Sequence, residues 1–195
     1  MGLRQCARHA LISLAMATAL GVSGSAHAAE CADLWSWLNQ ACRTLGDTYH
    51  NGHNELVLSG YSWHTPWTWD ADKRAEKTAE SWGAGWARTV EHENGNTDSV
   101  FALVFRDSHA KPQYNVGYAW LKFWGSRSDL QPGLGYTAFL FARNDIANGW
   151  PVPAALPLAS LRYDRFMLLG TYVPALGQGV NNGSVFYFFG KITLD

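Results

Sequence analysis

The sequence predicts an all-β protein: an eight-stranded antiparallel transmembrane β-barrel with an N-terminal amphipathic helix. Short segments in which apolar residues alternate with small or polar ones recur along the chain, separated by turn residues. Aromatic residues make up 14% of the chain and tryptophan alone accounts for 10 residues, whereas charged residues are only 16%. No run of about 20 apolar residues occurs after residue 28, so a transmembrane helix is not expected there and a closed barrel is the remaining way to cross a bilayer.

The first 28 residues are typical of an export signal. Arg4 and Arg8 precede an apolar stretch over residues 10–22, and Ala26-His27-Ala28 forms a small-residue cleavage site. We expect this segment to be removed, leaving residues 29–195 as a single domain with a sizeable core. The 15 basic and 16 acidic residues are nearly balanced, so we expect no nucleic-acid partner.

An amphipathic helix is predicted over residues 32–46, ahead of a barrel over residues 55–195. Asp33 can cap the helix and Gly46 can end it. Apolar residues recur on one face at helical spacing, namely Leu34, Leu38, Ala41 and Leu45. Trp35 and Trp37 favour a helix at the membrane interface over one packed on a soluble core.

The sequence does not decide whether the cysteines form a disulfide. Cys6 is removed with the signal, so Cys31 and Cys42 remain in an oxidising compartment. A helix beginning at Cys31 would hold the two about 16 Å apart, beyond bridging distance. A disulfide therefore requires the first turn to fold back.

Eight segments have the pattern of strands: residues 55–63, 81–90, 99–106, 113–124, 133–143, 151–163, 165–173 and 184–194. Asn94-Gly95 is a strong hairpin signal between the second and third. Pro151, Pro153 and Pro157 lack ladder donors, so we expect the sixth strand to be interrupted. Eight antiparallel strands place both termini on one side of the membrane.

Polar residues end the first and third strands. Alternation in the first groups Val57, Tyr61 and Trp63 on one face and Leu58, Gly60, Ser62 and His64 on the other. In the third, Phe101, Leu103 and Phe105 lie opposite Ala102, Val104, Arg106 and Ser108.

We therefore expect His64 and Ser108 to face the lumen, and Asp107 to point away unless the strand twists or bulges. The first and third strands run in the same direction, so all three residues reach one rim. Any one of them alone is more simply interpreted as a turn residue. His50 and His53 form an H-x-x-H pair without a nearby third ligand, so no metal site is expected.

From about Glu55 to the C-terminus, the sequence resembles the lipid A palmitoyltransferase (PagP) family of the Gram-negative outer membrane. The segments that carry this resemblance include Ser62-Trp63-His64, Trp82-Gly83-Ala84-Gly85, Phe105-Arg106-Asp107-Ser108, Gly133-Leu134-Gly135-Tyr136-Thr137-Ala138, Leu156-Pro157-Leu158-Ala159-Ser160 and Thr171-Tyr172-Val173-Pro174.

The resemblance implies a tilted eight-stranded barrel in the cell outer membrane that moves a palmitoyl chain from the sn-1 position of a glycerophospholipid to a hydroxyl group of lipid A. It implies a monomer that needs no metal or diffusible cofactor. The family's catalytic positions fall on His64, Asp107 and Ser108. An imidazole suits the general base, and Ser108 suits an oxyanion donor or a nucleophile.

The resemblance also implies lipid-binding positions. The family admits lipid through two gaps where prolines interrupt the ladder. Pro157 and Pro174 match one gap, and Ser59 and Ser81 stand where the other has prolines. Ala119 occupies the place of a glycine that helps to set the acyl-chain length.

Two other functions fit the same pattern. A non-catalytic outer-membrane barrel shares the aromatic residues and turns but does not need His64 near Ser108. A soluble lipocalin-like lipid carrier also alternates, with its apolar face turned inward.

Overall fold

The computed structural model describes residues 31, 35–107, 110–175 and 183–194. The expected export signal lies outside these residues. All eight strands belong to the compact unit Gln40–Asp195. Among the described helices, none is long and apolar enough to cross a membrane.

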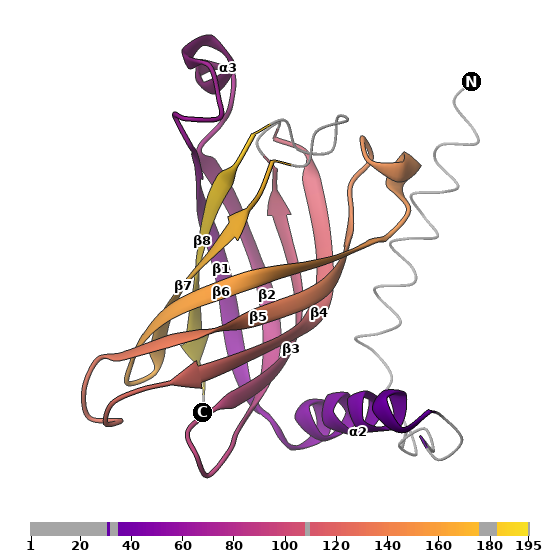
Figure 1. The fold of residues 1–195 in the computed structure, drawn as a ribbon, viewed down its shortest axis with the longest axis vertical. Coiled ribbons are helices and arrows are strands. Elements are labelled where there is room, and N and C mark those ends of the chain that lie inside the picture. The colour runs from indigo at the N-terminus through magenta and orange to yellow at the C-terminus, as the bar shows by residue number, and fades with distance from the viewer. Residues whose placement is uncertain (1–30, 32–34, 108–109, 176–182, 195) are drawn as a thin grey trace. The chain divides into compact units, whose positions relative to one another are not determined.

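Eight antiparallel strands close into a barrel in chain order, which confirms the predicted eight-stranded antiparallel barrel (Figure 1). They are β1 (His53–His64), β2 (Glu80–Glu91), β3 (Thr97–Arg106), β4 (Pro112–Phe123), β5 (Gln131–Ala142), β6 (Val152–Tyr163), β7 (Phe166–Val173) and β8 (Val185–Thr193). Each lies within two residues of its predicted bounds.

The two ends of the barrel differ. β1, β3, β5 and β7 finish at the end that carries the short helix α3 (Ala71–Ala75), called the α3 end below, and the C-terminus lies at the opposite end (Figure 1). The 3₁₀ turn η2 (Ala147–Gly149) lies in the connection from β5 to β6.

Helix α2 (Ser36–Asn51) corrects the predicted end at Gly46. A single glycine inside a helix costs only about 1 kcal/mol, and the hydroxyl of Thr48 bonds back to the carbonyl of Thr44 at 2.7 Å. The helix ends at Asn51 instead, immediately before Gly52. A Cβ at Gly52 would lie 2.5 Å from the Thr48 carbonyl oxygen and 2.7 Å from the Thr89 nitrogen, so only glycine fits between α2 and β1.

Cys31 and Cys42 are both disulfide-bonded. Because α2 begins at Ser36, the separation expected for a helix that starts at Cys31 does not apply.

A β-bulge in β1 reverses part of the predicted face assignment. The register of β1 against both neighbouring strands shifts between Ser59 and Tyr61. Val57 is therefore buried on the same side as Ser62 and His64, whereas Tyr61 and Trp63 are exposed. Grouping Val57 with Tyr61 was wrong because one extra residue exchanges the two faces beyond it.

The inner face of β3 also differs from the prediction. Leu103 and Asp107 are buried, and Val104 and Arg106 are exposed. Asp107 thus continues the inward face by regular alternation, so the expectation that it points away from the lumen was wrong. Ser108 lies outside the described residues.

Strand β6 is not interrupted by its prolines. It pairs with β5 from Val152 to Arg162, but β7 joins it only from Leu158 onward. The prediction of a broken strand was wrong because the prolines fall in the stretch that needs only one partner.

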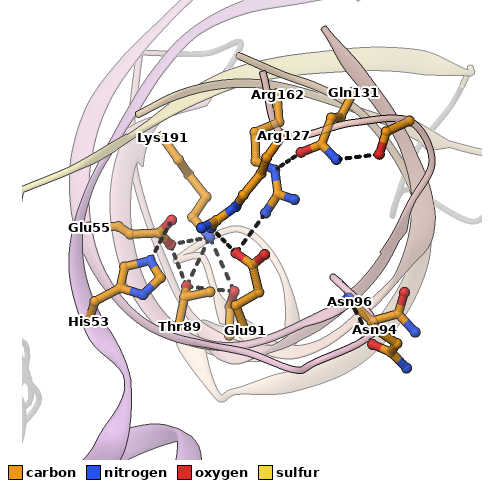
Figure 2. A network of polar contacts seen from close by, with 12 residues as sticks. His53, Glu55, Thr89, Glu91, Asn94, Asn96, Arg127, Gln131, Arg162 and Lys191 are labelled. Carbon is orange, nitrogen blue, oxygen red and sulfur yellow. Dashed lines mark hydrogen bonds and ion pairs between the residues drawn. The ribbon is translucent and has the colours of Figure 1, made fainter. Parts of the chain in front are cut away.

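Apolar side chains fill the interior in two clusters, whose buried members are Ala119, Leu121, Phe123, Leu158, Met167 and Leu169 in one and Val57, Ala87 and Leu103 in the other. Nearer the C-terminal end the interior is polar. The Lys191 ammonium pairs with Glu55 and donates to Thr89 and Ser99, and Arg162 bonds Gln131 and Glu91 (Figure 2). Figure 2 shows these side chains converging inside the barrel, where a cavity of about 410 Å³ is lined in part by Glu55 and Arg162.

The outer wall carries many large exposed apolar side chains. They include Leu58, Tyr61, Trp63, Trp82, Trp86, Val104, Val116, Leu134, Tyr136, Leu140, Leu161, Tyr163, Phe166 and Leu168. An apolar outer wall around a partly polar interior is the reverse of the arrangement in a soluble barrel.

Candidate active site at the α3 end

His64 is the last residue of β1 and is 9% exposed. Its imidazole packs edge to face with Trp69, with the ring centroids 5.4 Å apart and the planes at 80°. The bulge in β1 is what turns this side chain inward, because without it the alternation set by Val57 would place His64 on the outer face.

A cluster of buried hydroxyl groups fixes the chain immediately after His64. The Thr65 N–H donates to the Ser184 carbonyl at 3.1 Å, and the Thr65 and Ser184 hydroxyls lie 2.7 Å apart. Thr68 Oγ1 accepts from the Ser184 N–H at 2.8 Å. Thr65 and Ser184 have no exposed surface, so the end of β1 is held firmly against the start of β8.

Asp107 is 4% exposed and organises the turn from β3 to β4. Its carboxylate accepts the N–H of Lys111 at 2.8 Å, and its own N–H donates to the Lys111 carbonyl at 2.8 Å. Arg143, just after β5, places its Nε 3.4 Å from the second carboxylate oxygen and also bonds Asp145. Burial alone would lower the pKa of Arg143, but the contacts with Asp145 and Asp107 raise it, so the guanidinium is charged.

The structure therefore brings His64 and Asp107 to the same end of the barrel, as the topology predicted. The position of Ser108 remains a prediction. An imidazole and a carboxylate in a buried rim are suited to proton transfer, which needs a base with a pKa near neutral pH.

Ala119 lies well inside the barrel, on the inward face of β4 with Asn115. It is 9% exposed and adjoins the apolar cluster that includes Leu121 and Leu158.

The wall is incomplete between β6 and β7 toward the α3 end. The first pair between these two strands is Leu158 with Thr171, so the residues of β6 before Leu158 and the last residues of β7 are not paired with each other. Pro157 and Pro174 border this unpaired stretch, and the Thr171 hydroxyl donates to the Pro157 carbonyl at 2.7 Å.

The seam between β1 and β2 is held by hydroxyl groups at the bulge. Ser59 Oγ donates to the Ser81 carbonyl, and the Ser62 and Ser81 hydroxyls lie 3.0 Å apart. On the outer wall at this level a groove of about 570 Å³ is lined mainly by apolar residues, including Tyr61 and Trp82.

The H-x-x-H pair has structural contacts. The His50 carbonyl accepts from Arg88, and His53 lies 3.6 Å from Glu55. Within the described part of the chain, no group of three or more His, Cys, Asp or Glu side chains is placed to hold a metal ion.

Sequence reasoning missed Trp69, Ser184 and Arg143. Arg143 belongs to the segment Ala142-Arg143, which also carries the family resemblance but suggested no role for the arginine, and Ser184 is 115 positions from Trp69. A loop rich in tryptophan after the first strand was the one signal available for Trp69, and it does not distinguish Trp69 from Trp67.

Comparison with known proteins gives a consistent result. Residues 44–191 match the family model described as antimicrobial peptide resistance and lipid A acylation protein PagP. A protein named lipid A acyltransferase PagP from Legionella pneumophila is 35% identical over 93% of this chain and 96% of its own length. Proteins of the same name are 36% identical in Methylobacillus flagellatus, over 95% of this chain and 97% of theirs, and in Bordetella parapertussis, over 85% and 90%.

Proposed function

The chain belongs to the PagP family, and from this premise we propose that it transfers a palmitoyl chain from the sn-1 position of a glycerophospholipid to a hydroxyl group of lipid A in the cell outer membrane. The observation that supports this most directly is that the inward-facing His64 and the buried Asp107 lie at the same rim of a barrel with an apolar outer wall.

The outer wall supports insertion in the bilayer. Its exposed Trp, Tyr, Leu and Phe side chains would be removed from water by lipid chains. A soluble carrier would instead turn its apolar face inward. We propose that the protein acts as a monomer, because a closed barrel leaves no strand edge to pair.

The reaction requires two proton transfers, one from the acceptor hydroxyl to His64 and one from His64 to the leaving glycerol oxygen. His64 removes the proton from the lipid A hydroxyl while that oxygen attacks the ester carbonyl, and the new C–O bond gives a tetrahedral intermediate whose former carbonyl oxygen carries the negative charge. The bond to the glycerol oxygen then breaks as His64 gives that oxygen the proton, and the lysophospholipid leaves. Ser108 either donates a hydrogen bond to the oxyanion or attacks first as the nucleophile. Asp107 acts by fixing the turn that carries Ser108.

The acyl chain is held in the interior between the α3 end and Ala119. From Gln113 to Ala119 the strand descends about 15 Å, at ~3.3 Å per residue and ~40° tilt. Below Ala119 the apolar cluster closes the interior, so the methyl group of Ala119 forms part of the floor.

Lipids enter through the wall. The unpaired stretch between β6 and β7, bordered by Pro157 and Pro174, admits the donor chain sideways because no ladder bonds have to break. The seam with Ser59 and Ser81 opens for the second lipid at the cost of side-chain hydrogen bonds.

The test uses purified protein in detergent micelles with lipid A and phospholipids labelled in either the sn-1 or the sn-2 chain. We expect label to reach lipid A from sn-1 donors only. A folded His64→Ala protein is the control. A folded wild-type barrel that transfers no label from either donor would support the non-catalytic alternative, and a water-soluble monomer without detergent would support the carrier.

A further inference from the structure

Two tryptophans of the loop after β1 have opposite environments. Trp67 is 64% exposed and packs edge to face on Trp63, with the ring centroids 5.6 Å apart. Trp69 is only 9% exposed and packs on His64, at 5.4 Å between the centroids. Only the second of these rings is placed to influence the proposed base.

Trp69 is itself fixed from several sides. Its N–H donates to the Thr65 carbonyl at 3.2 Å, and its indole Nε1 donates to the Ser184 carbonyl at 3.1 Å. Gly183 completes the enclosure, because a Cβ there would lie 2.4 Å from Nε1 and 2.5 Å from Cε2 of the indole. The ring has little freedom to move without disturbing the start of β8.

Trp69 also contacts a cation of its own loop. The Lys77 ammonium lies 5.7 Å from the centroid of the indole, within the range of a cation–π interaction. Residues before and after α3 therefore meet at this ring, and the loop is folded back toward the rim that carries His64.

We propose that Trp69 is the positioning residue of His64: its indole, held by Ser184 and Gly183, keeps the imidazole in the one orientation that reaches the acceptor hydroxyl. This inference rests on the proposed function, in which His64 is the base. A base must lie within hydrogen-bond distance of the proton that it takes, and a misplacement of about 1 Å costs on the order of 100-fold in rate.

The first test compares substitutions at the two tryptophans. Trp69→Leu removes the ring and is expected to lower kcat about 10- to 100-fold with little change in KM. Trp69→Phe keeps a ring but loses the bond to Ser184, so we expect an intermediate loss. Trp67→Leu is the matched control from the same loop and should stay within about twofold of the wild type.

The second test moves the indole without changing it. Gly183→Ala forces the ring away and should reproduce the kcat loss of Trp69→Leu. Gly190→Ala on β8 is its control, since the nearest atom to the added Cβ would be 3.7 Å away, an ordinary contact. A structural role alone would lower the stability of the variants without separating kcat from KM.

The third test observes His64 directly by NMR of the protein in detergent micelles. The ring current of the Trp69 indole changes the chemical shifts of nearby imidazole protons, so Trp69→Leu should move the His64 ring resonances and Trp67→Leu should not. Unchanged His64 resonances in folded Trp69→Leu and Gly183→Ala would overturn the inference, as would a wild-type kcat in both. If the wild-type protein transfers no acyl chain, the proposed function fails, and the NMR comparison still decides whether Trp69 orients His64.

Discussion

The size of the side chain at position 119 should set the length of the transferred acyl chain. Ala119 is 9% exposed and faces the interior of the barrel, with the apolar cluster around Leu121 and Leu158 closing the space beyond it. Replacing it with methionine raises the floor of the acyl-binding space, and replacing it with glycine lowers the floor by one methyl group.

The expected magnitude follows from the length of the added side chain. Methionine is longer than alanine by about three chain atoms, so a sixteen-carbon chain loses the burial of about three methylenes, or ~2.4 kcal/mol at ~0.8 kcal/mol each. At about 1.4 kcal/mol per tenfold, kcat/KM for a palmitoyl donor should fall ~50-fold relative to a donor shorter by about three carbons. Ala119→Gly should change the preference by only about fourfold, toward equal or longer chains.

The assay presents the enzyme with a mixture of phospholipids whose sn-1 chains contain from 10 to 18 carbons, and measures the acylated lipid A products by mass spectrometry. Ala138→Met is the matched control, because Ala138 is exposed on the neighbouring strand β5. An unchanged chain-length profile in folded Ala119→Met and Ala119→Gly proteins would refute the assignment of Ala119 to the floor. A shift in Ala138→Met as large as that in Ala119→Met would also contradict it.

Three further predictions follow from the barrel and its site. The protein should require detergent, show mainly strand by circular dichroism, and change its gel mobility when heated; a water-soluble monomer would contradict bilayer insertion. His64→Ala and Ser108→Ala should each lower acyl transfer about 100- to 10,000-fold without unfolding the barrel, and wild-type rates in either folded variant would remove that residue from the mechanism. Lys191→Met leaves the Glu55 carboxylate buried without its lysine partner and should lower the unfolding free energy by about 3–5 kcal/mol, measured by denaturant titration in detergent. Adding Glu55→Gln to this variant should restore most of the lost stability. Equal stabilities of the single and double variants would argue against coupling between the two residues.

The strand positions could be predicted from the sequence because alternation is a local property. A strand with one face toward lipid and one toward the interior repeats every two residues, and its turns require particular residues such as Asn94-Gly95. Both signals lie within about ten residues of chain. Neither depends on which strands become neighbours.

Only the tertiary structure shows which face of β1 and which face of β3 points inward. The bulge between Ser59 and Tyr61 appears only when β1 is paired with β2 and β8, and it decides that Val57 and His64 share the interior. For β3, both faces carry apolar residues, so local pattern could not identify the inner one, and Asp107 was assigned to the wrong side.

The sequence by itself determined the fold class, the strand order and the meeting of His64 with Asp107 at one rim, since these follow from alternation and from the direction of antiparallel strands. Only the tertiary structure revealed the contacts of Trp69 with His64, Ser184 and Gly183. The reason is closure: β8 meets β1 only when the barrel is complete, which brings together residues more than 100 positions apart that have no shared pattern in the chain.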